Sequence, residues 1–140
     1  MHRPAPAVRL PSLRGAGMVS LASLTGKPIV LNFWSSTCPP CKKETPALAS
    51  VARVMRGKVT FVGIDSADLR GPASAFITKY KVPYPVAFDG AATATSAYGI
   101  VALPVTFFLS PSGKTILGEN VGGLTRAGLR TILGRLYRVT

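Results

Sequence analysis

The most informative part of the chain, residues 29–43, reads Ile29-Val30-Leu31-Asn32-Phe33-Trp34-Ser35-Ser36-Thr37-Cys38-Pro39-Pro40-Cys41-Lys42-Lys43. Its first six residues form an almost continuous apolar run, which is typical of a strand buried on both faces. Apolar residues at i, i+3, i+4 and i+7 then predict a helix, and they are Leu48, Val51, Ala52 and Met55. The two cysteines of the chain therefore lie where a buried strand ends and a helix begins.

Similar patterns recur on both sides of this segment. Further apolar runs predict buried strands at residues 59–64 and 105–109. Shorter patterns and turn residues predict an N-terminal hairpin over 8–20, helices over 71–80 and 93–98, an extended piece at 86–88 and a return strand at 114–118. The chain ends in a predicted amphipathic helix whose apolar face comprises Leu129, Ile132, Leu133, Leu136 and Tyr137.

This order of elements, strand–helix–strand followed by hairpin–helix, is that of an α/β protein. We expect a central mixed β-sheet flanked by helices on both faces, with an N-terminal β-hairpin extension. The 140 residues have about the length of one domain. We therefore predict a single domain over 1–140, made of the extension with its hairpin (1–26) and a core (27–140).

The composition is that of a folded protein with a strong excess of positive charge. Hydrophobic residues make up 47% of the chain, which excludes intrinsic disorder, and no apolar stretch approaches the roughly 18 residues of a membrane-spanning helix. The net charge of +12 is typical either of a well-solvated surface or of a protein with an anionic partner. Because the cations are spread along the chain and no nucleic-acid-binding motif is present, we favour the solvated surface and expect no nucleic-acid partner. The segment after Glu119 is the exception, because it has no acid and contains Arg126, Arg130, Arg135 and Arg138; for this segment an acidic surface stays open as a partner, on a weak signal.

The two cysteines suit redox chemistry better than metal binding or a structural bridge. A structural zinc site takes four ligands, whereas this chain offers Cys38, Cys41 and its single histidine, His2. Closing so short a loop removes only about 2 kcal/mol of unfolded-chain entropy, so a bridge here adds little stability. We therefore expect a redox-active pair with neither a metal nor another cofactor.

The place of the pair at a helix start indicates how it reacts. The first N–H groups of a helix lack partners, and the helix dipole adds positive potential there. Both favour a thiolate at Cys38, whose pKa we expect below the usual value of about 8.5. The residues Lys42 and Lys43 either add to this effect or are simply solvated. The Cys38 thiolate would attack a partner disulfide, and Cys41 would then attack Cys38 and release the reduced partner; run backwards, the same site oxidises dithiols.

The segment Asn32–Pro46 resembles the active-site segment of thioredoxin-like proteins, most closely the TlpA/ResA type of thiol:disulfide oxidoreductase. Matching motifs cover nearly the whole chain, at Ala5–Pro11, Tyr84–Asp89, Tyr98–Ile100, Leu103–Leu109 and Gly113–Lys114. The resemblance implies a thioredoxin-like fold and an extracytoplasmic, monomeric reductant. Its export or anchor segment would lie outside this sequence, and an anchor segment would tether the protein to the membrane. It also implies protein partners with thiols or disulfides, apocytochrome c or other exported proteins among them, and an unidentified redox partner.

The resemblance further implies which residues contact a substrate. Pro104 matches the family's cis-proline beside the dithiol, where it would leave the backbone of Leu103 free to pair with a substrate strand. Trp34 matches a residue that packs beside the disulfide, and Pro39 and Pro40 complete the expected substrate-binding set. The plainer alternatives are an ordinary strand-start proline for Pro104 and plain core for Trp34.

The resemblance also implies a route for the proton of the second cysteine. Glu44 matches the acidic residue that accepts the Cys41 proton, although a glutamate in a first helical turn can merely complement the helix dipole. Thioredoxins proper usually have a buried Asp where this chain has Asn32, whereas the TlpA/ResA type commonly has Asn, which favours Glu44 as the acceptor. Thr37 replaces the tryptophan that often precedes the first cysteine, so we expect the rim of the binding surface to differ.

Other classes of protein fit the sequence less well. A peroxidase of the peroxiredoxin type shares the fold, but it needs a proline and a threonine upstream of its reactive cysteine. In this chain Leu31 and Ser35 stand seven and three residues before Cys38, so the required proline is missing. A copper chaperone would need three residues between its cysteines and a histidine ligand. This chain has only two residues between Cys38 and Cys41, and we expect no histidine ligand. An extracytoplasmic oxidase that introduces disulfides stays open, as does a non-catalytic basic binding module on a thioredoxin scaffold, which leaves the cysteine pair unexplained.

Overall fold

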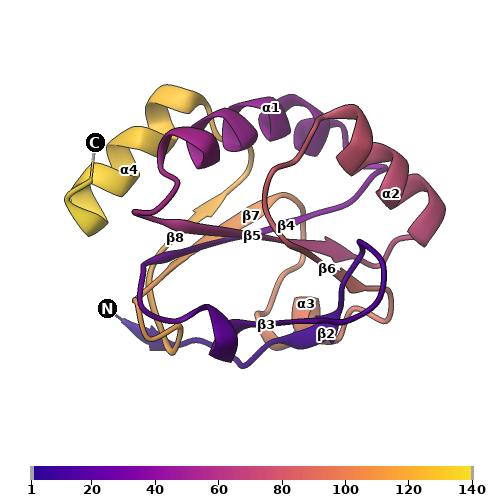
Figure 1. Cartoon of the computed structure of the whole chain (residues 1–140), viewed down its shortest axis with the longest axis horizontal. Helices are drawn as coiled ribbons and strands as arrows, with labels where there is room; N and C mark the ends of the chain where they lie inside the picture. The colour runs from indigo at the N-terminus through magenta and orange to yellow at the C-terminus, as the bar shows by residue number, and fades with distance from the viewer. Residues whose placement is uncertain (1, 140) are drawn as a thin grey trace.

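A six-stranded mixed β-sheet lies at the centre of the computed structural model, which describes residues 2–139 (Figure 1). The strand order is β1-β8-β7-β4-β5-β6, in which β4, β5 and β6 are parallel and the other neighbours are antiparallel. Strands β2 and β3 form a separate hairpin. The elements are β1 (Arg3–Pro4), β2 (Arg9–Pro11), β3 (Met18–Ser20), the 3₁₀ helix η1 (Leu21–Leu24), β4 (Ile29–Trp34), α1 (Pro39–Val54), β5 (Thr60–Ser66), α2 (Arg70–Lys79), β6 (Val86–Asp89), α3 (Thr93–Ala97), β7 (Val105–Leu109), β8 (Thr115–Val121) and α4 (Arg126–Tyr137).

Strand β4 is buried along its whole length because its side chains alternate between two apolar layers. Val30 and Trp34 pack into one core cluster, and Leu31 and Phe33 pack into the other. Asn32 points to the same side as Val30 and Trp34, and its side chain is only 2% exposed. A buried amide in this position requires polar partners from the elements packed against it.

Three helices cover one face of the sheet, and a thinner layer covers the other (Figure 1). Helices α1, α2 and α4 bury apolar side chains in the first core cluster, including Leu48, Phe76 and Leu133. The opposite face is covered by α3 and the hairpin β2–β3, which contribute Ala94 and Val19. Helices therefore flank the sheet on both faces, and the predicted fold class with its N-terminal hairpin is confirmed.

The parallel strands bring several chain segments to one edge of the sheet. Strands β4, β5 and β6 all end at this edge, at Trp34, Ser66 and Asp89. Helix α1 begins at Pro39, shortly after β4 ends, so its N-terminus lies at the same edge. In open α/β sheets, this is the edge at which binding and catalytic groups gather.

Two local features differ from the sequence analysis. The strand β1 pairs with β8, Arg3 lying opposite Ile116, but two residues are too short to carry a periodic pattern. Helix α2 begins at Arg70, so Pro72 lies within its first turn, where a missing N–H is tolerated because these groups have no partner inside the helix. No helix in the described part of the chain is both long enough and apolar enough to cross a membrane.

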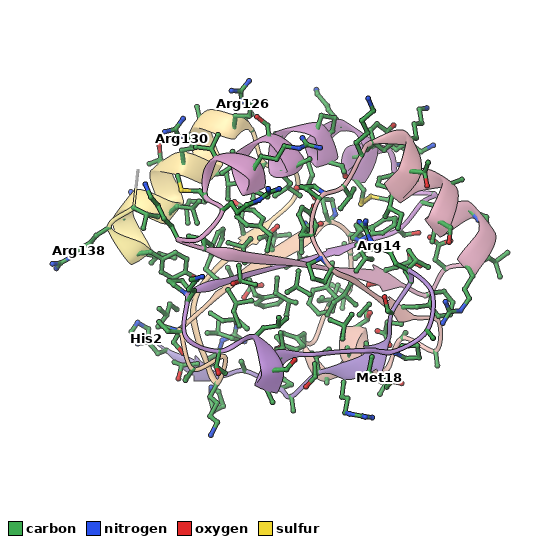
Figure 2. The ribbon with its side chains drawn as sticks, viewed as in Figure 1. His2, Arg14, Met18, Arg126, Arg130 and Arg138 are labelled. Atoms are coloured by element: carbon green, nitrogen blue, oxygen red, sulfur yellow. A yellow bond between two sulfur atoms is a disulfide. The ribbon has the colours of Figure 1, made fainter. Side chains whose placement is uncertain are left out.

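The excess positive charge lies largely on the outside of the molecule. Figure 2 shows Arg126, Arg130 and Arg138 pointing away from α4 and its C-terminal end, and all three are exposed. Across residues 2–139, the one ion pair joins Arg3 to Glu119 at 2.7 Å. Most cations are therefore free to interact with solvent rather than with acidic neighbours.

The packing of α4 predicts a large loss of stability when its buried face is truncated. Leu133 is 0% exposed, so Leu133→Ala leaves a cavity and should lower the free energy of unfolding by about 2–5 kcal/mol. Arg130→Ala, on the exposed face of the same helix, is the matched control and should stay within about 0.5 kcal/mol of the parent. Urea unfolding followed by Trp34 fluorescence measures both. Equal losses in the two variants would contradict the docking of α4 on the sheet.

Candidate active site

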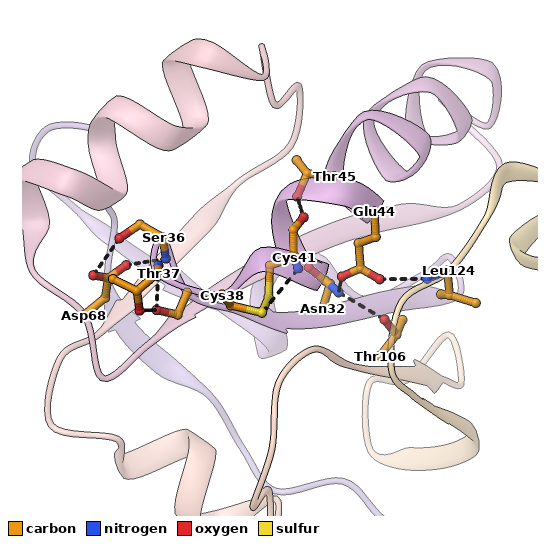
Figure 3. The surroundings of a disulfide bond; sticks show 11 residues. Asn32, Ser36, Thr37, Cys38, Cys41, Glu44, Thr45, Asp68, Thr106 and Leu124 are labelled. Carbon is orange, nitrogen blue, oxygen red and sulfur yellow. Dashed lines mark hydrogen bonds between the residues drawn. A yellow bond between two sulfur atoms is a disulfide. The ribbon is translucent and has the colours of Figure 1, made fainter.

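A disulfide between Cys38 and Cys41 closes the first turn of α1 at the edge of the sheet (Figure 3). Cys38 caps the helix, and its Sγ accepts a hydrogen bond from the Cys41 backbone N–H with a donor–acceptor distance of 3.2 Å. Cys38 is half-buried, whereas Cys41 is 0% exposed. A partner protein can therefore reach Cys38 but not Cys41.

The residues between the cysteines explain why the helix begins here. Pro39 and Pro40 occupy the first helical positions, where the fixed φ of proline suits a helix and its missing N–H is not needed. The first free donor of the helix is then the Cys41 N–H, which points at the Cys38 sulfur. Together with the helix dipole, this donor favours negative charge on that sulfur once the disulfide is reduced.

Glu44 is a buried carboxyl that connects α1 to the elements beneath it. Its side chain is 2% exposed, and it accepts hydrogen bonds from Asn32 Nδ2 at 2.9 Å and from the Leu124 backbone N–H at 3.1 Å. Asn32 also donates to Thr106 Oγ1 at 3.0 Å (Figure 3). Burial raises the pKa of Glu44 from 4.5 to about 7, although the two hydrogen bonds act to lower it. Near neutral pH this carboxyl can therefore accept or release a proton, and it lies one helical turn from Cys41.

The loop of residues 35–37, between β4 and the disulfide, is held by the segment that follows the neighbouring strand β5. Asp68, in the segment after β5, accepts hydrogen bonds from the Ser36 backbone N–H at 2.8 Å and from Ser36 Oγ at 2.9 Å (Figure 3). Within the loop, Ser35 Oγ and Thr37 Oγ1 form a hydrogen bond at 3.1 Å. The chain is thereby fixed on the approach to Cys38.

The segment that precedes β7 lies beside Cys38, because Leu103, next to Pro104, lines the same hollow as Cys38. The Leu103–Pro104 peptide bond is cis, and the Pro104 carbonyl accepts a hydrogen bond from the Gly122 N–H at 2.9 Å. Leu103 is half-buried and Pro104 is buried. A hollow of about 420 Å³ lies between this segment and Cys38, and it is lined by Cys38, Pro39, Pro40, Ser66, Ala67, Thr95, Ile100, Val101, Ala102 and Leu103. The structure thus brings Cys38, the two prolines of the motif and Leu103 to one surface.

A larger groove begins on the other side of the same prolines. It has a volume of about 1050 Å³ and runs between α1 and the start of α4. Glu44 and Leu124 lie in its wall, and the cations Lys43 and Arg126 also line it. Pro39 and Pro40, both exposed, therefore line both hollows, and the smaller of the two also contains Cys38.

Trp34 lies behind the site rather than on its surface. Its side chain is 4% exposed and stacks on Phe76, with ring centroids 4.4 Å apart and ring planes inclined by 22°. It belongs to the same apolar cluster as Cys41. A ring that is only 4% exposed presents little surface to a substrate, so the structure places Trp34 within the core beneath the site rather than on the substrate-binding surface that the resemblance implies.

Several polar residues of the site are not apparent from the sequence alone. Thr106 and Asp65 each interrupt an apolar strand, and Asp68 follows shortly after the second of these strands. A polar side chain inside a buried strand needs a partner, which is the signal that could have identified the first two. In the region that the structure describes, no group of three or more His, Cys, Asp or Glu side chains is placed to hold a metal ion.

Comparison with known proteins places this site in a family. The sequence model of the AhpC/TSA family matches residues 1–116. The chain belongs to the AhpC/TSA family. Among curated relatives of this AhpC/TSA protein, the thiol-disulfide oxidoreductase ResA of Bacillus subtilis (strain 168) is 33% identical over 99 residues, which is 70% of this chain. The chain spans 55% of the length of that relative.

Solved structures agree with this assignment. A thiol:disulfide interchange protein DsbE from Chlorobium tepidum is 28% identical, with a TM-score of 0.83 over 95% of each chain. A secreted disulfide oxidoreductase from Mycobacterium tuberculosis is 29% identical, with a TM-score of 0.78 over 94% of this chain and 96% of that one. The expected resemblance to thioredoxin-like proteins of the ResA type is thereby confirmed.

The raised pKa of Glu44 predicts how the stability of this AhpC/TSA protein depends on pH. At pH values between the pKa of Glu44 in the unfolded chain, about 4.3, and its pKa in the folded protein, the folded state keeps a proton that the unfolded state has released. Stability therefore falls as pH rises through this range. As the pH rises toward about 7, the pKa of Glu44 in the folded protein, the free energy of unfolding of the parent should fall relative to that of Glu44→Gln. Above this pH the difference between the two proteins should change no further.

Urea unfolding of the oxidised protein at a series of pH values measures this difference. Subtracting the Glu44→Gln curve from the parent curve removes contributions that the two proteins share, including those of other buried acids. A difference that does not vary with pH, or that grows as pH rises, would show that the pKa of Glu44 is not raised.

Proposed function

We propose that this AhpC/TSA protein is a thiol:disulfide oxidoreductase whose Cys38–Cys41 pair exchanges with the disulfides of protein partners. The asymmetry of the pair carries the proposal, because Cys38 is accessible at a helix N-terminus while Cys41 is fully buried behind it. An accessible sulfur that is stabilised as a thiolate can attack a partner, whereas a buried sulfur reacts with its bonded neighbour. A structural bridge would require neither property.

In the reduced protein, the Cys38 thiolate attacks one sulfur of a partner disulfide. A mixed disulfide forms, and the second partner sulfur leaves as a thiolate. Cys41 then gives its proton to the Glu44 carboxylate and attacks the Cys38 sulfur. The Cys38–Cys41 disulfide forms, the partner leaves with its second thiolate, and two electrons have passed from the protein to the partner. Glu44 suits the proton transfer because its pKa of about 7 lies close to neutral pH.

The surface around Cys38 has the properties of a protein-binding surface. Leu69, Val101 and Val121 are large apolar side chains that are nevertheless exposed. Leu69 follows the Asp68 that holds the loop before Cys38, Val101 shares the hollow beside Cys38, and Val121 lines a neighbouring cavity with Val101. Exposed apolar side chains grouped in this way favour a protein partner over a small charged substrate. We propose that an extended partner segment lies along Leu103 and brings its disulfide to Cys38.

We further propose that the protein acts outside the cytoplasm as a reductant of exported proteins, with apocytochrome c among them. The support is its similarity to ResA and to the secreted M. tuberculosis oxidoreductase. Disulfides form and persist in such compartments, so a reductant there has substrates. We also propose that the protein acts as a monomer. A tether to the membrane, in a segment outside this sequence, is one arrangement that fits this role.

Single substitutions of the cysteines should give different products. Cys38→Ala removes the attacking thiolate, so reduction of a protein disulfide should fall to the uncatalysed rate. Cys41→Ala retains the attacking thiolate but cannot resolve the product, so a mixed disulfide should accumulate. Insulin reduction measures turnover, and mass spectrometry of acid-quenched samples detects the mixed disulfide.

Ser96→Ala, at an exposed position of α3 whose side chain takes no part in the site, serves as a control that keeps both cysteines, and it should retain turnover. Turnover by Cys41→Ala at the parent rate would contradict the two-cysteine mechanism. Absence of turnover in the parent, with no mixed disulfide in Cys41→Ala, would favour a non-catalytic binding module.

A further inference from the structure

Asp65 is a buried carboxyl that the exchange mechanism does not use. It lies near the end of β5, where it is paired with Trp34 of β4 and with Phe88 of β6. Its side chain is 0% exposed, and neither carboxylate oxygen accepts a hydrogen bond from an N–H or O–H donor. A carboxylate that is buried without donors is very unfavourable, whereas a protonated carboxyl needs only one acceptor for its proton.

The hydrogen-bond partner of the Asp65 carboxyl is Asp68, three residues further along the chain. Asp68 Oδ1 accepts hydrogen bonds from Ser36 Oγ and the Leu69 N–H, and Oδ2 accepts from the Ser36 N–H. A carboxyl that accepts three such bonds is stabilised as the anion. Burial acts to raise the pKa of Asp68, but hydrogen bonds from Asp65, Ser36 and Leu69 outweigh it, and the pKa is lowered.

We propose that Asp65 is protonated at neutral pH and donates its proton to Asp68, and that this carboxyl–carboxylate pair positions the loop of residues 35–37 before Cys38. Asp65 is thus a positioning residue, since it acts on the redox site through Asp68 and Ser36. Its relevance to exchange rests on the proposed function of the cysteine pair.

The charged groups around Asp65 support a neutral carboxyl. They are Asp68 in the following loop, Asp89 at the end of β6 and Arg70 in α2. The Arg70 guanidinium lies 4.5 Å from the centroid of the Phe88 ring and donates to the Ser12 carbonyl. Burial, the hydrogen bond with Asp68 and the charges of Asp68 and Asp89 raise the pKa of Asp65 to about 9, although Arg70 acts to lower it.

Loss of this proton would place two adjacent anions behind the loop, because Asp68 is already ionised. Like charges at such a distance repel, and the bond between the two carboxyls would be lost. Asp68 would then no longer be held in the position from which it binds Ser36. The redox loop should therefore loosen in alkaline solution, or when residue 65 cannot donate a hydrogen bond.

Two substitutions separate the hydrogen bond of Asp65 from its charge. Asp65→Asn keeps a donor toward Asp68 but cannot titrate, whereas Asp65→Leu has a similar shape and no donor. The chain has only three aspartates, so their side-chain carboxyl ¹³C signals can be assigned in the oxidised protein. Hydrogen exchange of the Ser36 amide reports the loop, and alkylation of Cys38 in the reduced protein reports the site.

We expect the Asp65 carboxyl to titrate with a midpoint near 9 and to move to lower pH in Asp68→Asn. Asp65→Asn should leave the Ser36 exchange rate and the Cys38 alkylation rate at pH 7 within about twofold of the parent, because one neutral donor replaces another. Asp65→Leu should accelerate Ser36 exchange by about tenfold or more, since a hydrogen bond to a charged group is lost. In the parent, the same acceleration should appear above the Asp65 midpoint and be absent from Asp65→Asn.

An Asp65 carboxyl that titrates below about pH 5, as an ordinary aspartate does, would overturn the proposal. So would an Asp65→Asn protein whose Ser36 amide exchanges as fast as that of Asp65→Leu. The carbon titration needs only the parent, so it decides the matter even where Asp65→Leu does not fold. Insulin reduction by the parent is measured alongside: its absence would overturn the proposed function alone, while an ordinary Asp65 titration would overturn this inference alone.

Discussion

The hydrogen bond from Asn32 to the Glu44 carboxyl joins the central strand of the sheet to the helix that carries both cysteines. The same carboxyl accepts the Leu124 N–H from the segment before α4, and the same amide donates to Thr106 in β7. Strand β4, helix α1, strand β7 and the segment before α4 therefore meet around one buried polar network. Removing one partner would leave buried polar atoms unsatisfied, at a cost of about 1–3 kcal/mol, so the position of α1 and of the disulfide depends on this network.

The molecule separates its charges by depth. Glu44, Asp65 and Asp89 are buried, while the many Lys and Arg side chains give the chain its net charge of +12 and lie largely outside. Burial favours the neutral form of a carboxyl, so Glu44 and Asp65 hold protons at pH values where exposed acids are ionised. Glu44 thus carries its proton one helical turn from Cys41, whereas Asp65 carries its proton behind the loop that precedes Cys38.

The sequence predicted the parts of the structure that depend on local pattern, and it missed those that depend on tertiary contacts. Period and run length identified β4, β7 and α4, and the two cysteines indicated the reactive end of α1. The partner of Asn32 could not be read in the same way, because Glu44 reaches it only after helix and sheet pack together. The stacking of Trp34 on Phe76 likewise joins residues that are distant in sequence. The carboxyl pair of Asp65 depends on the burial of that side chain, which results from tertiary packing.

We propose that the Cys38–Cys41 pair is a reversible two-electron couple that supplies electrons to protein disulfides. Its reduction potential tests this most directly, by equilibration in thiol–disulfide buffers while the fluorescence of Trp34, which packs in the same cluster as Cys41, is followed. We expect a single reversible transition at or below about −230 mV, among the reducing members of such couples. A midpoint near about −120 mV would make the protein an oxidant and contradict the proposed direction. No reversible transition at all would contradict the redox function itself.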